Sequence, residues 1–139
     1  MIKIQESPID ILELNNDVNI SESGAIVTFV GTVRNHDESS KTEIKALYYE
    51  AYEEMAIKKI DEIIDEAKNK FHIKKVSIIQ RIGTIGVKEA SIGIAVSSEH
   101  RKNAFLACEY IIDKIKEISP IWKKEIYADN SEIWKSETG

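Results

Sequence analysis

The sequence has 139 residues, of which 42% are hydrophobic, so it predicts one folded domain spanning residues 1–139 and excludes a disordered chain. Its formal charge of −5 argues against general nucleic-acid or membrane-surface binding. The single cysteine excludes an internal disulfide or a cysteine-rich metal site, and the absence of a leader pattern or a long apolar run predicts a soluble cytoplasmic protein.

The first half of the chain predicts three strands and a short helix. The helix is expected at 8–15, because Ser7 can cap a helix that carries Pro8 in its first turn. The segment 24–33 is nearly all apolar and β-branched, which predicts a strand buried on both faces. The other elements expected here are a strand at 1–5, a turn at 15–17, a mobile polar loop at 38–41 and a strand at 44–50.

The second half predicts two long amphipathic helices. Apolar residues recur at helical spacing from about residue 52 to 71, and again from a start at Ser97 or Ser98 to a stop at 119–120. The elements expected around them are strands at 74–82, 90–97 and 122–127, a turn bracketed by Gly83 and Gly86, and a short strand at 133–134. The class is therefore α+β, with both long helices packed on a mostly antiparallel sheet.

The stretch 97–125 gathers a histidine and four cations around the second long helix of an acidic protein, and we interpret it as a site for a phosphorylated small molecule. His100 and Arg101 fall in the first turn of that helix, where unpaired backbone N–H groups and the helix dipole favour an anion. The alternative is that Glu99 neutralises this turn and Arg101 is a surface residue.

Lys116 lies at the shoulder of the apolar face of the same helix. One interpretation is that its stem covers apolar surface while its ammonium stays in water. The other is a partly desolvated amine that serves as a nucleophile or a proton carrier. In the strand that follows, alternation places Lys123 and Glu125 on one face and Lys124 on the other. The break at 119–120 can fold Lys123 back toward Lys116, whereas the alternative is an exposed edge strand protected by its charges.

Three other features of the sequence could serve either a ligand or the fold. The cluster at 34–36 follows a buried strand and opens a loop, which suits either ligand contacts or a solvated loop. Cys108 belongs to the apolar stripe of the second long helix, so it is expected to be inert. Trp122 and Trp134 are expected to be core or interface anchors, and the spacing of the polar residues indicates no metal site or bound cofactor.

Taken together, five segments resemble the family of the large, catalytic subunit of molybdopterin synthase: 24–36, 49–55, 81–83, 98–101 and 120–125. The resemblance implies a hammerhead-type α+β fold and a homodimer that binds a small ubiquitin-like subunit at each end, as a heterotetramer. The small subunit would donate sulfur from a C-terminal Gly-Gly thiocarboxylate to cyclic pyranopterin monophosphate, forming the dithiolene of molybdopterin.

The resemblance also assigns roles to residues. Arg34, after Thr32 and Val33, would contact the pterin phosphate together with His100 and Arg101. Lys116 and Lys123 would be the two essential lysines, and Lys124 and Glu125 would complete the binding strand. Two other functions remain open from the residues alone: a non-catalytic module that binds the tail of a ubiquitin-like protein, and a phosphate-ester sensor.

Overall fold

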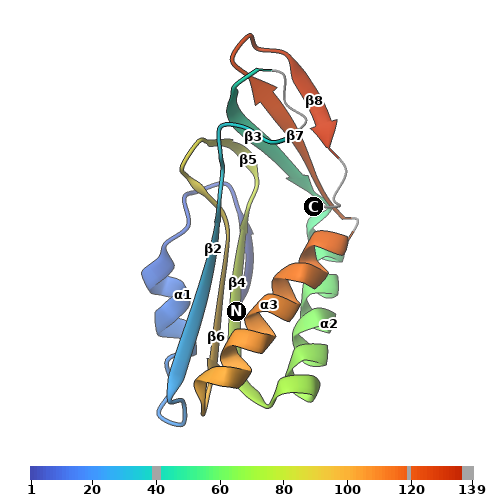
Figure 1. Ribbon diagram of the computed structural model, residues 1–139. Coiled ribbons are helices and arrows are strands. Elements are labelled where there is room, and N and C mark those ends of the chain that lie inside the picture. Colours follow the sequence, from blue (N-terminus) through green and yellow to red (C-terminus); the bar gives the residue numbers. More distant parts are fainter. Residues whose placement is uncertain (39–41, 119, 136–139) are drawn as a thin grey trace.

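The computed structural model describes residues 1–38, 42–118 and 120–135, which form three helices and eight strands (Figure 1). In chain order the elements are β1 (Ile2–Gln5), α1 (Ile11–Val18), β2 (Ala25–Thr32), β3 (Ile44–Ala51), α2 (Glu53–Phe71), β4 (Ile73–Arg81), β5 (Gly83–Gly86), β6 (Ala90–Ser98), α3 (Arg101–Glu117), β7 (Ile121–Tyr127) and β8 (Glu132–Lys135). In the described parts of the chain, no helix combines the length and the apolar character that a bilayer crossing needs.

The strands form two sheets, whereas the sequence pattern indicated one. The first sheet has the order β1-β4-β6-β2, in which β1 and β4 are parallel and the other pairs are antiparallel. The second sheet has the order β5-β3-β7-β8 and is antiparallel throughout. The α+β class is confirmed.

Helices cover both faces of the first sheet (Figure 1). The main core lies under α2 and α3, where their apolar stripes meet buried side chains of β4 and β6. A smaller core lies under α1, where Leu14 packs closely over Gly93. A Cβ at position 93 would come within 2.5 Å of Leu14 Cδ1, so the absence of a side chain at Gly93 lets α1 pack closely against the sheet. The second sheet extends past the end of the first, beside the C-terminal end of α3 (Figure 1).

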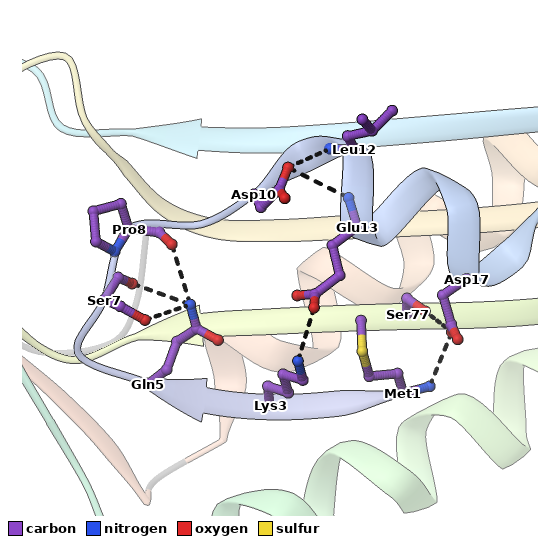
Figure 2. Close-up of polar contacts among 10 residues, drawn as sticks. All are labelled: Met1, Lys3, Gln5, Ser7, Pro8, Asp10, Leu12, Glu13, Asp17 and Ser77. Carbon is purple, nitrogen blue, oxygen red and sulfur yellow. Dashed lines mark hydrogen bonds and ion pairs between the residues drawn. The ribbon is translucent and has the colours of Figure 1, made fainter.

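The short first helix starts later than predicted. Asp10, rather than Ser7, is its N-cap, and Asp10 Oδ1 accepts hydrogen bonds from the backbone N–H groups of Leu12 and Glu13 (Figure 2). Ser7 instead accepts hydrogen bonds from the side chain of Gln5. The turn predicted at 15–17 is instead part of α1, and the side chains of Asn15 and Asp17 accept hydrogen bonds from the hydroxyls of Thr28 and Ser77.

Three other local predictions are wrong. Strand β2 is an edge strand whose Ile26 and Val30 are 37% and 36% exposed, so it is not buried on both faces. Residues 83–86 form β5, because pairing with β3 buries Ile85. Ser97 and Ser98 complete β6, and α3 begins at Arg101 after His100 as its N-cap.

Most predicted elements are confirmed, including both long helices and strands β1, β3, β4, β6, β7 and β8. Trp122 and Trp134 are not core residues, since they are 46% and 54% exposed on the second sheet. Most of the predicted mobile loop, residues 39–41, lies outside the described residues.

Candidate active site

A cavity of about 430 Å³ opens where the two sheets meet the last turns of α3. The end of β2 forms one wall, strands β3 and β7 form another, and Ile112, Ile115 and Lys116 of α3 form a third. Apolar side chains make up much of the lining, so a charged group inside is partly shielded from water. This size and composition suit a small polar ligand or a peptide tail.

Three predicted site residues bring cationic groups to this cavity: Arg34, Lys116 and Lys123. Arg34 is the second residue after β2, beyond the point where the ladder between β2 and β6 shifts register at Gly31 and Thr32. Val33 anchors the chain where it leaves β2, because this residue is 2% exposed and its backbone forms hydrogen bonds with the backbone of Glu89 and Lys88. Thr32 lines the cavity, whereas Val33 is buried beside it.

Lys116 reaches the cavity from the last turn of α3. It shares a flank of the helix with Ile112, on the side turned away from α2 and toward β2. The helix ends at Glu117, one residue later, so the cavity lies at its C-terminal end. The Lys116 side chain is exposed, as expected for a lysine whose stem covers apolar surface.

The predicted alternation along β7 is confirmed. Lys123 and Glu125 line the cavity, and Lys124 lies on the opposite face. There the Lys124 ammonium lies 2.6 Å from Glu132 and stands over the rings of Tyr48 and Trp134. The hydrogen bond with Glu132 raises the pKa of Lys124.

Glu125 is the buried carboxylate of the cavity. Glu125 is 5% exposed, and its Oε1 accepts a hydrogen bond of 2.5 Å from the Tyr127 hydroxyl. The Lys135 ammonium lies 3.3 Å from the same oxygen. The hydrogen bond with Glu125 raises the pKa of Tyr127, which keeps the phenol in the protonated form that donates.

His100 and Arg101 do not line this cavity. They lie at the start of α3, and the fifteen steps along the helix from Arg101 to Lys116 span about 22 Å at 1.5 Å each. Both side chains are exposed, and His100 Nε2 lies 4.0 Å from Glu99. Within one chain, the structure therefore separates these two residues from the other predicted phosphate contacts.

The cavity is prepared for an anion. Among the described residues, neither the Arg34 guanidinium nor the Lys123 ammonium forms an ion pair or hydrogen bond with the protein. The lining also carries the carboxylates of Asp37 and Glu125, but both of these are ion-paired with Lys135, so the cations of the cavity favour a bound phosphate or carboxylate. In the same described parts, no three His, Cys, Asp or Glu side chains are arranged to hold a metal ion.

Comparisons with known proteins identify the family of this chain. Residues 4–118 match the family model described as MoaE protein. The molybdopterin synthase catalytic subunit of Thermoplasma volcanium is 50% identical over 133 residues, which are 96% of each chain. The chain belongs to the MoaE family, the catalytic subunits of molybdopterin synthase.

Solved structures place the fold in the same family. The crystal structure of molybdopterin synthase from Staphylococcus aureus superposes with a TM-score of 0.89 at 41% identity, covering 95% of this chain and 94% of that one. A complex of subunits 1 and 2 of molybdopterin-converting factor from Helicobacter pylori gives 0.78 at 25% identity, covering 98% and 90%. Membership in the MoaE family makes this chain an enzyme subunit.

The structure adds three polar residues to the predicted MoaE-type site: His36 and Asp37, which line the cavity, and Lys135, which bonds to Glu125. His36 belonged to the polar cluster that the sequence singled out after the buried strand. Lys135 carried no comparable signal, because its place depends on the pairing of β8 with β7.

Cys108 takes no part in the cavity. Its side chain is 4% exposed in the core under α3, and burial raises the pKa of its thiol to about 11. A thiol with so high a pKa supplies almost no thiolate near neutral pH. The prediction of an inert cysteine is consistent with this position.

Proposed function

We propose that this chain transfers sulfur from the C-terminal thiocarboxylate of a small ubiquitin-like subunit to cyclic pyranopterin monophosphate, forming the dithiolene of molybdopterin. Its family supports the reaction, and the complex of the two subunits from Helicobacter pylori supports a small partner. The single observation that carries the proposal is the cavity that gathers Arg34, Lys116 and Lys123.

The chemistry assigns each cation a task. The phosphate of the pterin needs a planar, charged donor, which Arg34 provides where β2 ends. Attack on the acyl carbon of the thiocarboxylate develops negative charge, and opening of the cyclic phosphate needs a proton. Lys116 beside the donor tail and Lys123 on the facing strand serve these two needs. Lys124 lies on the opposite face of β7 and is left out of this machinery.

A second copy of the chain would bring His100 and Arg101 to the same cavity. Strand β2 is an edge of the first sheet, and its exposed Ile26 and Val30 lie beside that edge. Phe105, 60% exposed, lies on the same flank of α3 as Lys116, and Arg101 lies on that flank one turn before Phe105. This apolar surface suits a symmetric homodimer contact.

The polarity of β2 explains how such a dimer completes the site. The start of β2 lies beside the start of α3, because Gly24 N–H donates to the Ser98 carbonyl at 2.9 Å. The end of β2 lines the cavity. Antiparallel pairing of two β2 edges sets the start of one strand against the end of the other. His100 and Arg101 of one copy would then face Arg34 of its partner, and a small subunit at each cavity would give a heterotetramer.

Single-turnover sulfur transfer tests the reaction. The purified chain is mixed with thiocarboxylated small subunit and cyclic pyranopterin monophosphate, and dithiolene product is measured. We expect Lys116→Ala to lose at least about a hundredfold in rate, the usual scale for a positioned proton or charge donor. Lys114→Ala is the matched control, since Lys114 lies on the α2 side of the same helix over Tyr110. An unchanged rate in Lys116→Ala would overturn the proposal.

Mixed dimers test the shared site. In a dimer of one Lys116→Ala chain and one Arg101→Ala chain, a shared arrangement leaves one cavity fully intact. Random mixing of the two variants then restores about a quarter of the wild-type activity, because half of the dimers are mixed and each has one good site. No recovery on mixing would show that each cavity draws both residues from the same chain.

A further inference from the structure

Lys135 of β8 stands beside the cavity with two carboxylates as neighbours. Its ammonium lies 3.3 Å from Glu125 Oε1 and 4.0 Å from Asp37 Oδ2. The three side chains are only 23%, 6% and 20% exposed, respectively, so the cluster is largely removed from water. Both carboxylates belong to the lining of the cavity.

Burial makes Glu125 depend on its partners. An ionised carboxylate without a counter-charge is costly to bury, and removing one member of a buried ion pair is strongly destabilising. Here the Tyr127 hydroxyl and the Lys135 ammonium both reach Oε1. Lys135 is therefore the cation that satisfies this carboxylate in the described structure.

Lys123 is the nearest competitor for that role. It lies two residues before Glu125 on the same face of β7, at a spacing of about 7 Å along the strand. It is also the residue directly opposite Lys135 in the pairing of β7 with β8. A flexible lysine side chain can cover this distance, so Glu125 would attract Lys123 if Lys135 were absent.

We propose that Lys135 is a positioning residue of the active site, which holds Glu125 and thereby keeps the Lys123 ammonium available to the bound anion. The inference rests on the proposed function for the task of Lys123, but the arrangement of charges stands without it. Through Asp37, Lys135 also links β8 to the segment that carries Arg34. One ammonium thus supports both sides of the cavity.

The accessibility of Lys123 tests the arrangement without any reaction. The full chain is treated briefly with a small amine-acylating reagent, and acylation of Lys123 is measured by peptide mass spectrometry. In Lys135→Met, we expect labelling of Lys123 to fall about tenfold, because an ammonium paired with a carboxylate yields less free amine. Lys135→Arg should label like the wild type, and so should Lys135→Met with Glu125→Gln, in which the competing carboxylate is gone.

Lys74, an exposed residue of β4, provides the internal reference for reagent and folding. Unchanged labelling of Lys123 in Lys135→Met would overturn the proposal. If that variant does not fold, Lys135→Gln is compared with Lys135→Gln/Glu125→Gln. Equal labelling of Lys123 in these two variants would overturn the proposal in the same way.

Sulfur transfer then tests the consequence. Lys135→Met should lower the single-turnover rate about tenfold in the wild-type background and less than about twofold in the Glu125→Gln background, because a residue that acts through another loses its effect when that other is removed. Equal losses in both backgrounds would indicate a merely structural role for β8 and overturn the proposal. If the wild-type chain forms no dithiolene at all, the proposed function fails, while the labelling result still decides the role of Lys135.

Discussion

Lys123 and Lys124 are consecutive residues of β7, yet their ammonium groups lie on opposite faces of the second sheet. Lys123 lines the cavity, where no described protein group neutralises it. Lys124 has Glu132 as a counter-ion and two aromatic rings beneath it. We therefore expect Lys123 to contact a ligand and Lys124 to stabilise the fold.

The two lysines should respond in opposite ways to the same substitution. Lys123→Gln should raise the free energy of unfolding by about 0.5 kcal/mol, because it removes a like charge directly opposite Lys135. It should also abolish sulfur transfer. Lys124→Gln should lower the urea midpoint, because it loses Glu132 and both rings. Urea unfolding measures the stability of both variants, with Lys74→Gln as the control. A Lys123→Gln chain less stable than the Lys124→Gln chain would contradict the prediction.

Much of the fold was predictable because its signals are local. The apolar stripes of α2 and α3 and the alternation along β7 are periodicities within one segment, and the structure bears them out. The start of α1 was not predictable in this way. Ser7 and Asp10 are both good caps, and the choice depends on Gln5, whose side chain bonds to Ser7 and Pro8 (Figure 2).

The residues of the candidate site differ in the same way, because some of them carry a local sequence signal and others do not. Arg34 and Lys123 could be picked from their own strands, since each falls at a strand end or on a strand face. Lys135 could not be predicted, because its contact with Glu125 depends on the register of β8 on β7. The sequence of a four-residue strand does not determine that register. His100 and Arg101 lie at the start of α3, close to the helix start that the sequence indicated, but a local signal does not show whether they contribute to a cavity of a partner chain.

Cys108 should be dispensable for the reaction. Cys108→Ala removes one buried sulfur and should cost about 1 kcal/mol of stability, with sulfur transfer unchanged. The thiol should resist a soluble disulfide reagent until the chain is unfolded. A loss of activity in Cys108→Ala beyond its loss of folded protein would contradict this prediction.

The same thiol makes the fold sensitive to alkali. Its pKa is raised to about 11 in the folded chain, so the thiol stays protonated there while the unfolded chain ionises near its ordinary value. The contribution of the protonated thiol to the free energy of unfolding is therefore complete below the unfolded pKa of about 9. It declines as the pH rises toward 11, by less than about 1.4 kcal/mol per pH unit. Cys108→Ala should flatten this decline when unfolding is measured between pH 9 and 11, the range between the ordinary and the raised pKa of the thiol.

Asp17 should set part of the acid sensitivity of the fold. Its pKa is lowered by the hydrogen bond from Ser77, and further by the N-terminal amine and Lys75 (Figure 2). A lowered carboxyl pKa stabilises the folded chain above the unfolded value of 3.8 and ceases to do so as the pH falls through the folded value.

Asp17→Asn should therefore be less stable than the wild type at pH 7, and the difference should shrink below about pH 4. Ser77→Ala should lose about 1 kcal/mol at pH 7 through the missing hydrogen bond. Acid titration of the unfolding midpoint measures both. A gap between Asp17→Asn and the wild type that widens on acidification would contradict the sign.

Inorganic phosphate should stabilise the chain through Arg34 and Lys123. A ligand that binds only the folded state at tenfold its dissociation constant adds about 1.4 kcal/mol to the free energy of unfolding. Thermal unfolding in phosphate, compared with chloride at equal ionic strength, measures this shift, and Arg34→Gln should remove most of it. Glu13→Gln, on α1 and outside the cavity, serves as a control of equal size in charge change. The shift should also weaken near 1 M salt, where the screening length falls to about 3 Å. A phosphate shift that persists in Arg34→Gln and in high salt would mean that the cavity does not hold its anion through these cations.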